Sequence, residues 1–172
     1  MEGITGYIYR NALRSCYDNI DRYFTPFIMP NQNRCFNSRE LKDVLPANNR
    51  GMDTIPQILT NNAEDFVKTA LELQKMGYKE VNLNLGCPSR TVVTKMRGAG
   101  FLAEQQLLEK FLDVIFDRLY MKISVKTRIG MEDAKEFLLT AMGTTGTDEA
   151  NYTPGPELMP GMNFTMVRMD GK

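Results

Sequence analysis

The stretch of sequence that decides the fold is EVNLNLG, residues 80–86, because its apolar and polar residues alternate strictly. Successive side chains of a strand point to opposite faces, so the valine and the leucines share one face while Asn82 and Asn84 share the other. KISVKTR, residues 122–128, repeats this pattern and carries Lys126 on its polar face. Each of these two strands therefore has one apolar face and one face that becomes polar.

Strand-like and helix-like segments alternate around this stretch. We expect further strands at residues 23–28 and 54–60, and helices at 63–73, with Asn62 as the cap, and at 108–119, where apolar residues recur at helical spacing. This order predicts βαβ units with a parallel sheet, and hence a (β/α)8 barrel or an open doubly wound sheet. An open sheet with helices on both sides needs two apolar faces. We therefore predict an α/β fold, a partial (β/α)8 TIM barrel with roughly strands two to five and their helices.

The composition excludes several classes of function. The 21 basic residues balance the 21 acidic ones, so no net charge attracts nucleic acid or a membrane surface. The chain has no histidine, which excludes histidine bases and histidine metal ligands within it, and we expect no metal site. The three cysteines are widely spaced and form neither a CxxC pair nor a disulfide framework. The cysteine pattern predicts a reducing cytoplasm, and since no apolar run reaches the length of a bilayer span, we expect no membrane partner.

Polar residues gather at the end of the 80–86 strand. An asparagine amide offers a donor and an acceptor, which suits the imide edge of a flavin or a uracil, although buried amides often satisfy only one another. Cys87 follows directly, at the carboxyl end of a strand, where the catalytic groups of TIM barrels lie. Without a histidine neighbour its thiol suits a proton donor better than a nucleophile, and the alternative is a small buried hydrophobe.

Three further residues are candidates for the same site. Lys126 points inward and must be paired or functional, so an anionic cofactor and an acidic residue are both suitable partners. Gln57 also points inward, on the 54–60 strand. The loop after Cys87 is basic but has neither the P-loop nor the GxGxxG pattern. It is either a solvated charged loop or a contact to an RNA backbone, and we take Arg97 as its substrate-binding residue.

Five motifs together resemble the tRNA-dihydrouridine synthase family in their order and spacing. They are MEGITG at 1–6, PQIL at 56–59, NLNLGCPS at 82–89, RGAGFL at 97–102 and VKTRIG at 125–130. The resemblance runs from Met1 to about Glu136 and concerns the N-terminal half of the family. It implies a TIM barrel that binds FMN and, with NADPH as reductant, reduces uridines of tRNA to dihydrouridine.

The resemblance also implies roles for individual residues. Cys87 would protonate C5 of the uracil ring while C6 receives the hydride, and Asn84 would contact both the flavin and the substrate. Gln57 and Lys126 would bind FMN, and Met1 would lie against the flavin. Because the uracil belongs to a folded RNA, it would be flipped out into the site.

The limits of the resemblance predict the domain organisation. We expect an incomplete FMN-binding barrel domain at 1–142, without strand one and the later strands, and a Gly-, Pro- and Met-rich tail at 143–172 without packed structure. A truncated or frameshifted product of a synthase gene would have this organisation. Two alternatives stay open. One is an inactive half-barrel that acts only by self-association, and the other is a flavin barrel of the dihydroorotate dehydrogenase type.

Overall fold

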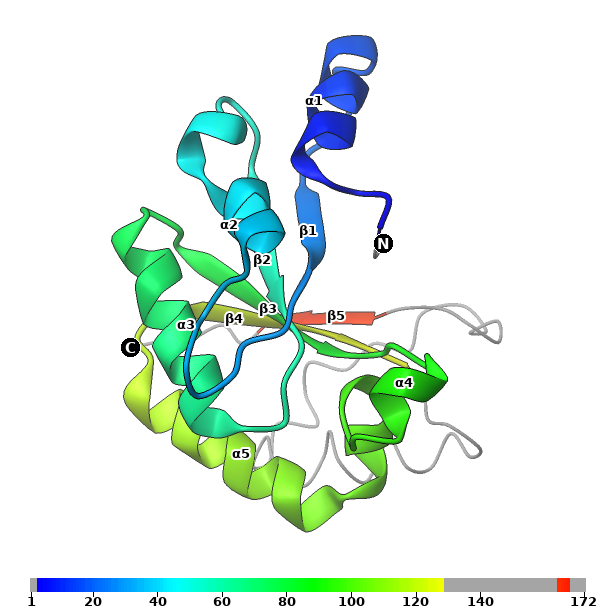
Figure 1. The fold of residues 1–172 in the computed structure, drawn as a ribbon, viewed down its shortest axis with the longest axis vertical. Helices are drawn as coiled ribbons and strands as arrows, with labels where there is room; N and C mark the ends of the chain where they lie inside the picture. Colours follow the sequence, from blue (N-terminus) through cyan, green and yellow to red (C-terminus); the bar gives the residue numbers. More distant parts are fainter. Residues whose placement is uncertain (1–2, 129–163, 168–172) are drawn as a thin grey trace, which may run out of the picture.

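The chain folds into an open α/β half-barrel (Figure 1). The computed structural model describes residues 3–128 and the backbone of 164–167. The strands follow the order β1-β2-β3-β4-β5, and β1 to β4 run parallel. The elements are α1 (Tyr7–Cys16), β1 (Tyr23–Ile28), α2 (Ser38–Val44), η1 (Pro46–Asn48), β2 (Thr54–Ile58), α3 (Ala63–Lys75), β3 (Glu80–Leu85), α4 (Arg90–Val93), η2 (Gly98–Ala103), α5 (Gln105–Arg118), β4 (Lys122–Thr127) and β5 (Phe164–Val167).

The main hydrophobic core lies between the sheet and the helices α3 and α5. The apolar residues of β3 and β4 join one buried cluster with Phe66 of α3 and Phe111 of α5, whose rings meet edge to face at 5.7 Å. Asn62 caps α3, because its side chain accepts a hydrogen bond from the Asp65 N–H at 3.0 Å. The expected strands and helices are confirmed, and so is the prediction of a partial barrel with one apolar and one polar sheet face.

Helix α1 is fastened to the rest of the chain by Arg10, a buried arginine that is only 1% exposed. Its guanidinium donates to the carbonyls of Thr5 and Asp43, both at 2.6 Å, and to Asn49 Oδ1 at 2.8 Å. The Asp43 carboxylate lies 3.9 Å from it and accepts the Tyr7 N–H. We call these residues the Arg10 cluster. It joins α1 to α2 and η1.

Tyr78 lies beside the Arg10 cluster and donates its hydroxyl to the Val44 carbonyl at 2.8 Å. Burial raises the pKa of Tyr78 to about 12, against the opposing effect of the Arg10 guanidinium. Burial also lowers the pKa of Arg10, and Asp43 works in the opposite direction. Tyr78 therefore remains protonated at neutral pH.

A fifth strand, Phe164–Val167, pairs antiparallel with β4. It belongs to the 143–172 segment, for which the sequence predicted no packed structure. Composition did not predict this strand, because pairing with a strand edge requires no hydrophobic periodicity. The outer edge of β4 offers backbone N–H and C=O groups to any extended segment. The rest of the tail and the boundary after residue 142 lie outside the described residues. In the described part of the chain, no helix is long and apolar enough to cross a membrane.

Candidate functional site

A row of side-chain amides crosses the polar face of the sheet from β2 to β4. Gln57 donates to Asn82 Oδ1 at 2.9 Å, and Asn84 donates to Gln57 Oε1 at 2.7 Å. Asn82 in turn donates to Ser124 Oγ on β4 at 3.0 Å. We call Gln57, Asn82 and Asn84 the amide row. It forms because the strand register places Gln57 beside Asn82, and Lys126 beside Asn84.

The turn that follows β3 fixes the orientation of the whole amide row. Asn84 Oδ1 accepts hydrogen bonds from the backbone N–H groups of Gly86, at 3.1 Å, and Cys87, at 3.0 Å. Two N–H donors require an oxygen, so the Asn84 nitrogen must point toward Gln57, which then presents its own oxygen. The nitrogen of Gln57 consequently faces Asn82. The Gly86–Cys87 turn thus determines the orientation of each amide group in the row.

This orientation decides what the site can offer a ligand. Both acceptor positions of Asn84 Oδ1 are occupied, whereas its nitrogen and that of Gln57 each make one of two hydrogen bonds among the described residues. Asn82 uses its oxygen for Gln57 and its nitrogen for Ser124, and it is 0% exposed. Asn82 therefore has the structural role foreseen for a buried amide, while Gln57 and Asn84 retain N–H donors.

Lys126 adds a positive charge next to these donors. It lies beside Asn84 across the β3–β4 pair and is half-buried. Its ammonium has no hydrogen-bond or ion-pair partner among residues 3–128. Of the two partners considered from the sequence, an anionic cofactor and an acidic residue, the acidic residue is not found among the described residues. A half-buried, unpaired lysine attracts an anionic or strongly hydrogen-bond-accepting group.

Cys87 lies at the carboxyl end of β3, immediately after the amide row, and is half-buried. Its N–H is bound by Asn84 and its carbonyl accepts the Ala99 N–H at 3.0 Å. The thiol therefore projects from a backbone that is held on both sides. Gln57, Asn84 and Lys126 share one face of the sheet, and Cys87 follows β3 directly, with its N–H bound by Asn84.

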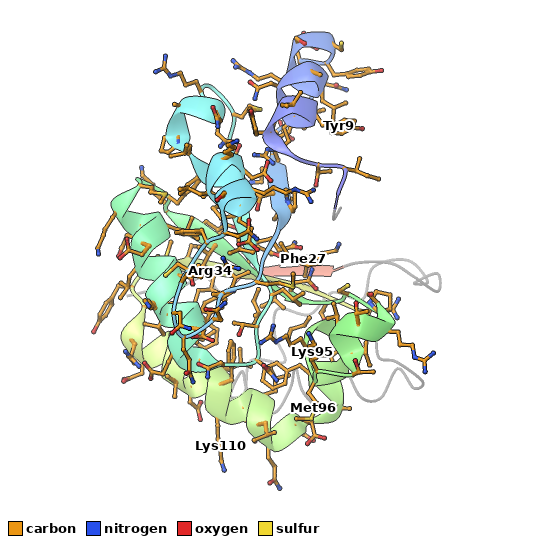
Figure 2. The ribbon with its side chains drawn as sticks, viewed as in Figure 1. Tyr9, Phe27, Arg34, Lys95, Met96 and Lys110 are labelled. Carbon is orange, nitrogen blue, oxygen red and sulfur yellow. The ribbon has the colours of Figure 1, made fainter. Side chains whose placement is uncertain are left out.

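The basic loop is held beside this end of the sheet by Asn61, a residue that sequence reasoning did not single out. Asn61 donates to the Lys95 carbonyl at 3.1 Å and accepts from Arg97 Nε at 3.4 Å. The remaining Arg97 nitrogens have no partner in the described part of the chain. Figure 2 shows Lys95 and Met96 in this loop, near α4. The signal for Asn61 was its place just beyond a strand, at the same end as Cys87.

The donors of the site fit the pyrimidine edge of a flavin. That edge carries carbonyl oxygens and ring nitrogens, and it becomes anionic on reduction. Gln57 and Asn84 offer N–H groups from a fixed direction, and Lys126 offers a charged donor on the neighbouring strand. These three residues could therefore hold FMN. Met1, expected to lie against the flavin, is outside the described residues.

Comparison with known proteins defines the class of this chain. A parallel half-barrel with amides and a cysteine at the carboxyl ends of its strands is typical of a TIM-barrel enzyme. The family profile "Dihydrouridine synthase (Dus)" matches residues 1–145, so the chain belongs to the dihydrouridine synthase family. This match extends beyond Glu136, the approximate limit of the resemblance predicted from the motifs.

Relatives with the name tRNA-dihydrouridine(20/20a) synthase match parts of the chain. The Vibrio parahaemolyticus protein is 38% identical over 81 residues, 47% of this chain and 25% of that protein. The Vibrio vulnificus protein is 34% identical over 95 residues, 55% of this chain and 29% of the relative. The Escherichia coli K12 protein is 40% identical over 70 residues, 40% of this chain and 20% of the relative. The aligned segments thus span about a quarter of these relatives.

Proposed function

We propose that this chain carries the flavin and uracil contacts of a tRNA-dihydrouridine synthase, an oxidoreductase that reduces uridine in tRNA to 5,6-dihydrouridine. The observation that carries the proposal is the fixed direction of the amide row. Its free N–H groups belong to residues that adjoin Cys87 and Lys126, and Lys126 has no partner among residues 3–128. The names of the relatives support the same substrate.

The chain's own residues would bind and orient the two rings. Gln57 and Lys126 would donate to FMN, and Asn84 would donate its remaining N–H to the flavin or to a uracil carbonyl. The free nitrogens of Arg97 would contact a tRNA phosphate, since a guanidinium matches the geometry of phosphate oxygens.

Reduction of the uracil double bond adds one hydride and one proton. When bound, FMN would supply the hydride after its own reduction by NADPH. Cys87 would hold the proton for C5, because its thiol lies at the carboxyl end of β3 and its backbone is fixed at both N–H and C=O. A thiol is a weak acid that can carry a proton and release it to a carbanion.

The test is turnover by the purified full chain, supplied with FMN and NADPH, on a tRNA transcript without modifications. We expect dihydrouridine in the digested RNA by mass spectrometry, loss of product in Cys87→Ala, and full product in Cys35→Ala, a matched change at another half-buried thiol. Flavin that stays with the protein through gel filtration should accompany activity. Absence of both product and retained flavin in the wild-type chain would refute the proposal.

The open sheet supports a second role, self-association through unpaired strand edges. β1 is the outer strand of the described sheet on one side. Pro26 and a register irregularity between Phe24 and Phe27 make this edge a poor template, which favours the enzymatic role. Gel filtration at several concentrations tests this role, since a concentration-independent monomer would exclude it. We also propose a cytoplasmic location, because all three cysteines are free thiols.

A further inference from the structure

The backbone of Cys87 is held from two directions that are distant in the sequence. Its N–H is bound by Asn84 Oδ1 at 3.0 Å, and its carbonyl accepts the N–H of Ala99, in η2, at 3.0 Å. With both peptide groups engaged, the backbone dihedrals of Cys87 are fixed and so is the direction of its Cα–Cβ bond. The sulfur can then move only about χ1.

Gly98 is what permits the second of these contacts. Its φ is +54°, and a Cβ built on it would lie 2.8 Å from the Cys87 carbonyl oxygen and 3.0 Å from the Cys87 Cβ. The same Cβ would lie 2.9 Å from Val92 Cγ1. Real Cβ atoms essentially never approach other atoms under 3.0 Å, so any larger residue would push η2 away from Cys87. Glycine is therefore required by close approach as well as by backbone conformation.

We infer that Gly98 and Asn84 are positioning residues that together set the direction of the Cys87 thiol. Asn84 acts through its oxygen, which is fully used by the backbone, and Gly98 acts by letting the Ala99 N–H reach the Cys87 carbonyl. The catalytic meaning of this arrangement rests on the proposed function. The hydrogen bonds to the Cys87 backbone do not depend on that proposal. A proton donor confined to one torsion needs little reorganisation to reach its acceptor.

The experiment compares Gly98→Ala with Gly77→Ala in the full chain. Gly77 is a matched control, because it also has a positive φ, +98°, but nothing lies within 4 Å of a Cβ at this position. A background of Cys16→Ser and Cys35→Ser leaves Cys87 as the only thiol. The readouts are amide hydrogen exchange at Ala99 and Cys87 by NMR, the rate of Cys87 alkylation by iodoacetamide, and kcat and KM with tRNA.

In Gly98→Ala we expect Ala99 exchange to quicken about tenfold, through the loss of one hydrogen bond. Alkylation of Cys87 should change about tenfold, and kcat should fall by about the same factor, because the thiol is displaced. Gly77→Ala should match the wild type in all of these. Equal exchange and alkylation in the two variants would overturn the inference.

Substitutions at Asn84 test the other half of the arrangement. Asn84→Asp keeps an oxygen for the N–H groups of Gly86 and Cys87, so protection of these amides should persist. Asn84→Ala should lose it, about tenfold for each amide. Loss in both variants, or in neither, would contradict positioning through the oxygen. If the wild-type chain makes no dihydrouridine, the proposed function fails, while exchange and alkylation still decide the inference.

Discussion

The Arg10 cluster and the amide row are both buried polar networks, and they differ in what surrounds the N–H donors that each leaves unused. Arg10 is 1% exposed and gives the hydrogen bonds of its two terminal nitrogens to Thr5, Asp43 and Asn49, while its Nε is buried without a partner in the described residues. The amide row is as deeply buried, with Asn84 2% exposed, yet it leaves N–H donors beside Cys87. Burial alone therefore does not distinguish a structural network from a binding one. What distinguishes the amide row is that its unused N–H donors belong to residues that adjoin Lys126 and Cys87.

The strongest test of the Arg10 cluster is Arg10→Met. The Asp43 carboxylate, whose side chain is 7% exposed, would lose its cationic neighbour, and α1 would lose its main attachment. We expect a loss of about 3 kcal/mol in the free energy of unfolding by urea. Arg14→Met is the control, because Arg14 is exposed and its side chain bonds only the Arg50 carbonyl among the described residues. We expect a change within about 0.5 kcal/mol. Equal effects would show that Arg10 does not fasten α1.

Asn82→Leu breaks the amide row in its structural part. The change removes the acceptor of Gln57 and the donor to Ser124, and leaves a buried amide nitrogen unpaired. We expect the free energy of unfolding to fall by about 2 kcal/mol. Asn19→Leu, at an exposed position, serves as the control and should stay within about 0.5 kcal/mol. If the two variants were equally stable, the row would not act as a connected network.

Tyr78→Phe probes the border of the Arg10 cluster by pH. The variant loses the hydrogen bond to Val44 and should be about 1 kcal/mol less stable at neutral pH. The folded pKa, about 12, exceeds the ordinary tyrosine value of 10.0, so the folded state holds this proton more tightly. The advantage of the wild type should be complete below pH 10 and shrink between pH 10 and 12. Urea midpoints at successive pH values measure it, and a constant difference would contradict the raised pKa.

Lys126→Met should have the smallest effect on stability. Its ammonium has no partner among residues 3–128, so we expect a change within about 0.5 kcal/mol, together with weaker FMN retention in a flavin titration. Lys122→Met is the matched control on the same strand face. It should cost about 1 kcal/mol, through its 2.8 Å ion pair with Glu80, without affecting flavin. A large loss of stability in Lys126→Met would assign this lysine to structure.

Local patterns predicted most of the elements and the faces of the strands. The alternation in β3 correctly separated the core leucines from the asparagines, and Asn62 was recognisable as a cap because its partner, Asp65, is three residues away. Arg10 gave no such signal, since its partners Asp43 and Asn49 lie more than thirty residues further along. Gly98 and Cys87 are likewise separated, and their contact depends on how η2 returns to β3.

The sequence by itself determined which residues form the strands, which side chains share a face, and which family the motifs resemble, because these depend on spacing along one segment. Only the tertiary structure decided that the oxygen of Asn84 is used by the Gly86–Cys87 turn, that Gln57 therefore presents a nitrogen, and that Lys126 lacks a partner in the described residues. The physical reason is that a hydrogen bond needs a donor and an acceptor in contact. Strand register and the return of η2 set those contacts across distances that no local pattern encodes.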